Sequence, residues 1–131
     1  LIAAISDLRD HWHGTSPHLE IMVHCDPELE ELKGEISLEI YRIIQEALTN
    51  TLRHSGGSQS IIRIEKTDQN KILLSIKDNG QGINQPAIPL GFGLNGMRER
   101  VASLRGQFKL INEMGQGLEI RIVLPWMKDA R

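Results

Sequence analysis

Two short segments joined by a turn constrain the fold of this chain more than any other feature. Residues 60–66 and 71–78 read as strands, and the turn-forming residues 67–70 between them predict a β-hairpin. In the second strand, Asp78 has the same parity as Ile72, Leu74 and Ile76, so these four residues project to one face. Asp78 therefore ends a core-facing row. It needs a polar partner there, because an unpaired buried charge is costly.

The rest of the chain alternates between strand and helix signals. We expect a strand at 18–25, helices at about 36–55 and from Leu94 to a stop at Gly106, a glycine-rich loop at 80–93, and a hairpin of 107–112 with 118–124. These elements predict a two-layer α/β sandwich. Its mixed, largely antiparallel sheet would have about five strands, with helices on one face.

Composition narrows the class of protein. The 131 residues are 40% hydrophobic, which fits one globular domain, and the net charge of −2 gives no basic surface for nucleic acid or anionic lipid. Cys25 is the single cysteine, so no internal disulfide can form, and a reducing, cytoplasmic compartment is favoured. No apolar run is long enough to span a bilayer, and no secretory signal is visible.

The first residues leave two interpretations open. Leu1, Ile5, Leu8 and Trp12 form one helical stripe. The stripe is either the tail of a helix that enters from upstream or a terminal helix packed on its own domain. Because the chain starts with Leu1 rather than Met, we expect a fragment. We assign residues 1–18 to an upstream helix or linker and 19–131 to the domain.

Polar residues along the 36–55 helix are candidates for binding a nucleotide. Glu46, Asn50 and either Arg53 or His54 are spaced so that they project from one side, opposite the apolar face. A solvated surface would explain the same stripe. However, an Asn oxygen suits Mg²⁺, and Arg and His are natural partners for phosphate oxygens.

The stretch Asp78-Asn79-Gly80-Gln81-Gly82 is a candidate site for a purine base. A carboxylate at the end of a buried strand can accept a hydrogen bond from the exocyclic amine of adenine. Gly80 and Gly82 would let the ring lie against bare backbone, and Ile83 could supply an apolar wall. Taken alone, Asp-Asn-Gly is a common turn.

Two further glycine motifs follow. Gly91-Phe92-Gly93-Leu94 precedes a helix, so its N–H groups could bind phosphate, although no Gly-Lys-Ser/Thr follows as in a Walker loop. Gly115-Gln116-Gly117 reads as a hairpin turn, which would matter for function only through closeness to the nucleotide.

Together and in this order, the four motifs resemble the ATP-binding catalytic domain of sensor histidine kinases. This domain belongs to the superfamily of gyrase, the large heat-shock chaperone and the mismatch-repair ATPase. Residues 46–50 with His54, and residues 93–101, look most like the nitrate- and hexose-phosphate-sensor subfamily. The resemblance covers roughly residues 19–125.

The resemblance implies a role for each matching residue. Asn50 would bind Mg²⁺, with Glu46 as a second candidate ligand; these two are also the candidate catalytic residues. Arg53 and His54 would contact phosphates, and Asp78 would hold adenine. The pocket and a short ATP lid would be formed by Gly80, Gly82, Ile83, Gly91, Phe92, Gly93, Leu94, Gly117 and Leu118.

The chain departs from the family pattern in two ways. Leu118 stands where the family usually has Thr or Ser, so a hydroxyl expected near the nucleotide is missing. None of the five histidines lies in a phospho-acceptor helix; they are His11, His13, His18, His24 and His54.

The implied function is transfer of the ATP γ-phosphoryl group to a histidine on an upstream dimerisation domain of the same protein. That protein would be a homodimer, and the phosphoryl group would pass on to a response regulator. The domain would be cytoplasmic in a membrane-anchored protein, without direct contact to membrane or nucleic acid. The alternatives are an anti-sigma-factor-type serine kinase and a non-catalytic nucleotide-binding module of the same fold.

Overall fold

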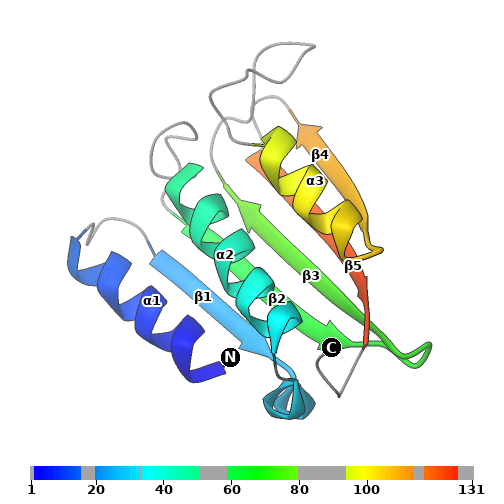
Figure 1. The fold of residues 1–131 in the computed structure, drawn as a ribbon. Helices are drawn as coiled ribbons and strands as arrows, with labels where there is room; N and C mark the ends of the chain where they lie inside the picture. Colours follow the sequence, from blue (N-terminus) through cyan, green and yellow to red (C-terminus); the bar gives the residue numbers. More distant parts are fainter. Residues whose placement is uncertain are drawn as a thin grey trace.

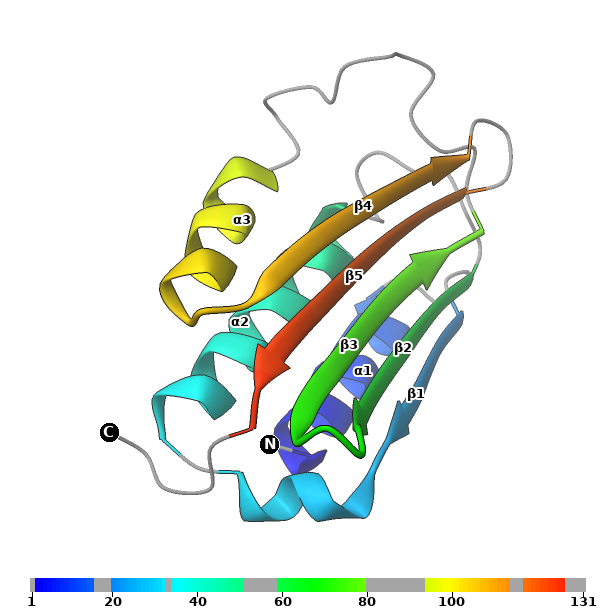
Figure 2. The same cartoon turned by 90° about the vertical axis from the view of Figure 1, so that its right-hand side faces the viewer.

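The chain folds into two layers, with helices on one face of a five-stranded sheet (Figures 1 and 2). This computed structural model describes residues 2–15, 20–32, 34–50, 59–79, 94–113 and 117–126. The helices are α1 (Ile2–Thr15), α2 (Glu35–Asn50) and α3 (Leu94–Ser103), with a short 3₁₀ helix η1 (Pro27–Glu31) after the first strand. The expected α/β sandwich is confirmed.

The sheet is mixed, as predicted. Its strands are β1 (Glu20–Cys25), β2 (Gln59–Lys66), β3 (Lys71–Asp78), β4 (Gln107–Glu113) and β5 (Gly117–Pro125), in the order β1-β2-β3-β5-β4. Only the β1–β2 pair is parallel among these five strands. The β2–β3 hairpin closes through Thr67 and Asn70, whose positive φ of 61° is tolerated by asparagine in turns.

The core lies between the sheet and the helices. The apolar face predicted for α2 is fully buried, and it consists of Ile36, Ile40, Ile43, Ile44, Ala47 and Leu48. On α1, Ile5 and Leu8 join the same core, and this helix packs beside β1 and α2. The interpretation of residues 1–18 as the end of an upstream helix remains a prediction. None of the described helices is long and apolar enough to cross a membrane.

The helix α3 ends close to the predicted position, but the reason why it ends there differs from the prediction. The left-handed residue that stops the helix is Arg105, with φ 61°, rather than Gly106. Arg105 N–H bonds to the Ala102 carbonyl at 2.9 Å, and Gly106 N–H bonds to the Val101 carbonyl at 2.9 Å, which is the Schellman pattern. Gly106 is needed for space: a Cβ there would lie 2.7 Å from the carbonyl oxygen of Val123.

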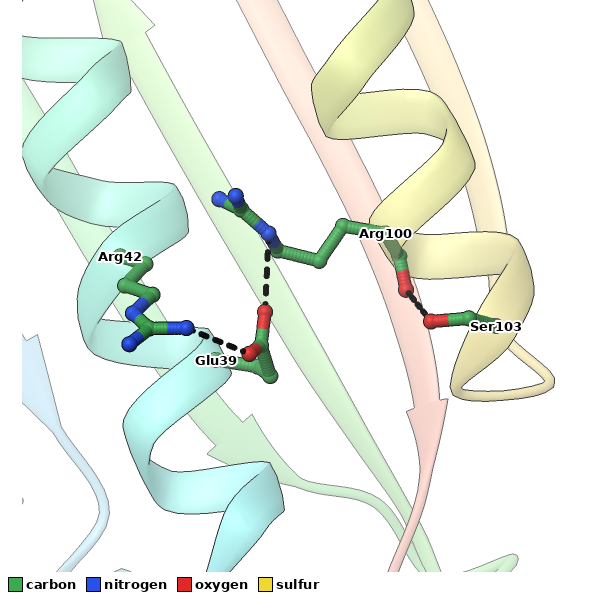
Figure 3. Close-up of polar contacts among 4 residues, drawn as sticks. All are labelled: Glu39, Arg42, Arg100 and Ser103. Atoms are coloured by element: carbon green, nitrogen blue, oxygen red, sulfur yellow. Dashed lines mark hydrogen bonds and ion pairs between the residues drawn. The ribbon is translucent and has the colours of Figure 1, made fainter.

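A carboxylate ties α2 to α3 (Figure 3). Glu39 on α2 contacts Arg100 Nε of α3 at 2.9 Å through one oxygen and Arg42 Nη1 at 3.2 Å through the other. The Glu39 side chain is only 12% exposed, so this bridge is better shielded from water than an ordinary surface ion pair. It fixes the spacing of two helices that carry predicted site residues.

Candidate functional site

The described parts of the predicted site lie at one end of the sandwich. The C-terminal end of α2, the N-terminal end of α3, the end of β3 and the start of β5 are all found there (Figure 1). The described residues of the helix motif and of the three glycine motifs are therefore found toward the same end of the molecule, although they are far apart in the sequence.

Asp78 has the buried position that its parity predicted. It is the last residue of β3, it is only 6% exposed, and it continues the core-facing row of Ile72, Leu74 and Ile76. The next residue holds the strand pair together: Asn79 N–H bonds to the Gln59 carbonyl at 3.1 Å, and Asn79 Oδ1 accepts from Gln59 N–H at 2.8 Å. These two hydrogen bonds hold the backbone directly after Asp78 against β2.

Gly117 brings a second strand close to the same point. It is the first residue of β5, and its backbone lies so near the Asp78 carbonyl oxygen that a Cβ would overlap with that oxygen. Its φ of 110° is also one that residues with a side chain rarely adopt. Gly117 therefore lies directly against the Asp78 backbone at the start of β5.

The positions of Leu118 and Leu94 are also clear. Leu118 is buried at 7% exposure and faces the same side as Asp78, so β5 contributes an apolar group where a hydroxyl was expected from the resemblance. Leu94 is the first residue of α3, and its side chain is buried in the core. The first N–H groups of a helix have no partner within the helix, so they can donate hydrogen bonds to a bound anion.

Glu46 and Asn50 lie one turn apart on α2. Glu46 is partly exposed, on the side of the helix away from the core, and Asn50 is the last helical residue. The other predicted site residues lie outside the described part of the chain: Arg53, His54, Gly80, Gly82, Ile83, Gly91, Phe92 and Gly93. Their roles stay predictions. Among the described residues, no three His, Cys, Asp or Glu side chains are grouped so that they could hold a metal ion.

Two other features lie outside the predicted site: the Cys25 thiol and a groove on the opposite face of the sheet. Burial raises the pKa of the Cys25 thiol to about 11, which keeps it protonated and unreactive at neutral pH. A groove of about 450 Å³ lies on the sheet face opposite the helices and is lined by Arg63, Lys77, Arg121 and neighbouring residues, none of them predicted for the site. Neither feature adds to the nucleotide chemistry.

Sequence reasoning missed one residue at the site. Ser60 on β2 pairs directly with Asp78 and is completely buried, and its Oγ has no hydrogen-bond partner in the described part of the chain. The observed hairpin turns over residues 68–70, with Thr67 N–H bonded to the Lys71 carbonyl, and this register places residue 60 opposite residue 78. A four-residue turn at 67–70 would have placed residue 77 there, so the sequence did not point to Ser60.

A helix-covered mixed sheet with a buried carboxylate and a glycine at one end is the arrangement predicted for an ATP-binding catalytic domain. Comparison with family models agrees. The chain belongs to the family of histidine kinase-, DNA gyrase B- and HSP90-like ATPases, whose model matches residues 35–128. The predicted superfamily is therefore confirmed.

Two similar proteins are a histidine-protein kinase/phosphatase and a sensor protein. The chain is 37% identical over 97 residues to the signal transduction histidine-protein kinase/phosphatase DegS of Brevibacillus brevis, covering 73% of this chain and 25% of DegS. It is 35% identical over 109 residues to the sensor protein VraS of Staphylococcus saprophyticus, covering 82% of this chain and 31% of VraS. The chain thus spans about a quarter to a third of these relatives. The narrower nitrate- and hexose-phosphate-sensor assignment remains a prediction.

Solved structures share the fold. The mycobacterial sensor histidine kinase MprB superimposes with a TM-score of 0.72 at 22% identity, covering 95% of this chain and 93% of that one. The catalytic domain of the histidine kinase ThkA gives a TM-score of 0.75 at 14% identity, covering 98% and 93%. At these identities the likeness supports the fold alone.

Proposed function

We propose that this chain is the part of a sensor histidine kinase that binds ATP and presents its γ-phosphate to a histidine on an upstream dimerisation domain. The phosphoryl group would then pass to a response regulator. The full protein would act as a homodimer, with residues 19–131 as a cytoplasmic domain and residues 1–18 joining it to a membrane-anchored remainder. The names of the similar proteins and the position of Asp78 support this proposal.

The observation that carries the proposal is the Asp78 carboxylate, buried at the end of an apolar row beside the bare backbone of Gly117. A buried carboxylate is retained where it has a polar partner to bind. The exocyclic amine of adenine is such a partner, and the amine is absent at that position in guanine. Asp78 would therefore select adenine, while Gly117 lets β5 lie close to the Asp78 backbone.

The phosphates would lie toward the ends of α2 and α3. Arg53 and His54 would neutralise charge, and the N–H groups at the start of α3 would bind phosphate oxygens. Asn50 would hold Mg²⁺, with Glu46 as the second candidate, because amide and carboxylate oxygens are the ligands that this ion prefers. Bound Mg²⁺ offsets the charge on the phosphates, and the protein contributes mainly positioning.

The decisive test is phosphoryl transfer. The chain is mixed with γ-labelled ATP and a separate polypeptide that carries the upstream dimerisation helices. We expect acid-labile label on a histidine of that polypeptide, and very slow turnover by the chain alone, because no nucleophile is then in line with the γ-phosphate. Acid-stable label on a partner serine would instead favour the serine-kinase alternative. ATP binding without any transfer would favour the non-catalytic module.

The metal assignment gives a second prediction. Asn50→Ala should remove most of the increase in ATP affinity that Mg²⁺ gives, while adenosine affinity stays unchanged, because only the phosphates need the metal. Calorimetric titrations with and without Mg²⁺ measure both quantities. Gln45→Ala is the matched control, since it removes an exposed side-chain amide from the same helix. Full Mg²⁺ enhancement in the Asn50 variant would place the metal on other residues.

A further inference from the structure

Ser60 is the polar side chain that the proposed site leaves unexplained. It is 0% exposed, yet its Oγ has no hydrogen-bond partner among the residues that the structure describes. A buried hydroxyl without a partner is costly, and most such groups in proteins are satisfied by protein or by ordered water. An orphaned hydroxyl at this position therefore points to a hydrogen bond that forms only when a ligand is bound.

The strand register puts this hydroxyl beside Asp78. Ser60 and Asp78 are direct cross-strand partners in the β2–β3 hairpin. The neighbouring pair, Gln59 and Asn79, exchanges two hydrogen bonds, one of them through the Asn79 side chain. Because the two kinds of pair alternate along an antiparallel ladder, Ser60 and Asp78 form a non-hydrogen-bonded pair.

Side chains are closest in pairs of that kind, where the Cα atoms lie only about 4.5 Å apart. Both residues share a face with the core-facing Ile62 and Ile76, which form the next pair of the same type. The side chains of Ser60 and Asp78 therefore start from adjacent backbone positions on the same side of the sheet. On β5, the equivalent end of the strand carries Leu118, which has no donor to offer.

We propose that Ser60 is a positioning residue of the adenine site. Its hydroxyl donates a hydrogen bond to the Asp78 carboxylate, directly or through one ordered water, when the adenine amine occupies the other part of that carboxylate. Ser60 thereby fixes the orientation of Asp78 and supplies the polar group that β5 lacks. This inference rests on the proposed role of Asp78 in binding adenine.

The test is the variant Ser60→Ala in the 131-residue chain. We expect ATP affinity to fall roughly tenfold, as for a lost hydrogen bond to a charged group. The midpoint of thermal unfolding should stay the same or rise, because alanine removes an unsatisfied buried hydroxyl without adding volume. Weaker ATP binding in an equally stable protein separates positioning from a general structural role.

A ligand without the amine sharpens the test. Purine riboside triphosphate gives the Asp78 carboxylate no donor, so Ser60→Ala should change its affinity less than twofold. Equal losses for both nucleotides would overturn a role exerted through Asp78. Ser75→Ala is the matched control: it removes a hydroxyl from the opposite face of the sheet, where Ser75 Oγ donates to Glu119 at 2.9 Å, and it should leave ATP affinity unchanged.

A double-mutant cycle with Asp78→Asn separates the proposed role of Ser60 from the proposed role of Asp78 in binding adenine. If Ser60 acts through Asp78, adding Ser60→Ala to Asp78→Asn should cost little further affinity. Loss of affinity in Asp78→Asn but not in Ser60→Ala would overturn this inference and leave the adenine site standing. Wild-type affinity in both variants would overturn the adenine site itself, and this inference with it.

Discussion

Replacing Asp78 with asparagine should weaken ATP binding by roughly 10- to 150-fold, which corresponds to about 1.5–3 kcal/mol for a charge-assisted hydrogen bond. Asparagine has nearly the same shape, so it keeps the packing at the end of β3, where Asp78 is almost fully buried. What it loses is the negative charge that accepts from the adenine amine. Calorimetric titration of both proteins with ATP measures the difference.

Asp68→Asn is the matched control, because Asp68 lies exposed in the turn at the other end of the same hairpin. It should bind ATP as the wild type does. GTP should bind the wild type poorly, since its O6 cannot donate to a carboxylate. In Asp78→Asn the preference for ATP over GTP should narrow, because an amide can also donate. An unchanged ATP affinity and preference would remove Asp78 from the base site.

Gly117→Ala should lower the free energy of unfolding by about 2–5 kcal/mol. Two costs combine: the backbone has a φ of 110°, and the new methyl group would overlap with the Asp78 carbonyl oxygen. Relief requires β5 to move away from β3 at the end that holds Asp78, so ATP affinity should fall as well. Urea denaturation and calorimetry measure the two effects.

The same substitution at Gly96 provides the control. Gly96 is exposed on α3, and a Cβ there would meet nothing within 4 Å. Gly96→Ala should therefore raise the free energy of unfolding by about 0.5–1 kcal/mol, as expected for alanine in a helix interior. A mild effect of Gly117→Ala, similar in size to that of Gly96→Ala, would show that β5 does not need a glycine at this point.

Local patterns were enough to predict most of the fold. The alternation that ends on Asp78 and the turn at 67–70 predicted β3 with its observed bounds, because period and turn chemistry are short-range properties. The apolar stripe of α2 likewise predicted which side is buried. Leu94 was correctly placed at the start of α3.

The sequence could not predict contacts between distant elements. The Glu39–Arg100 bridge joins two helices whose relative placement depends on the whole sheet. The demand for glycine at position 106 comes from the backbone of Val123 on β5, so a rule for helix ends assigned it the wrong cause. The candidate site was predictable only in part. Asp78 was found from its parity in β3. The closeness of Ser60 and Gly117 to Asp78 depends on how the strands pair, which the sequence pattern does not give.

The single parallel ladder has a consequence for the order in which the chain assembles. The β2–β3 hairpin closes over four residues, whereas pairing β1 with β2 brings Glu20 to Gln59 across η1 and α2. Loop-closure entropy rises with the length of the closed loop, and local contacts form faster. We therefore expect Ser60 and Asp78 to be brought together early, and α1 and β1 to dock onto a sheet in which these two residues are already paired.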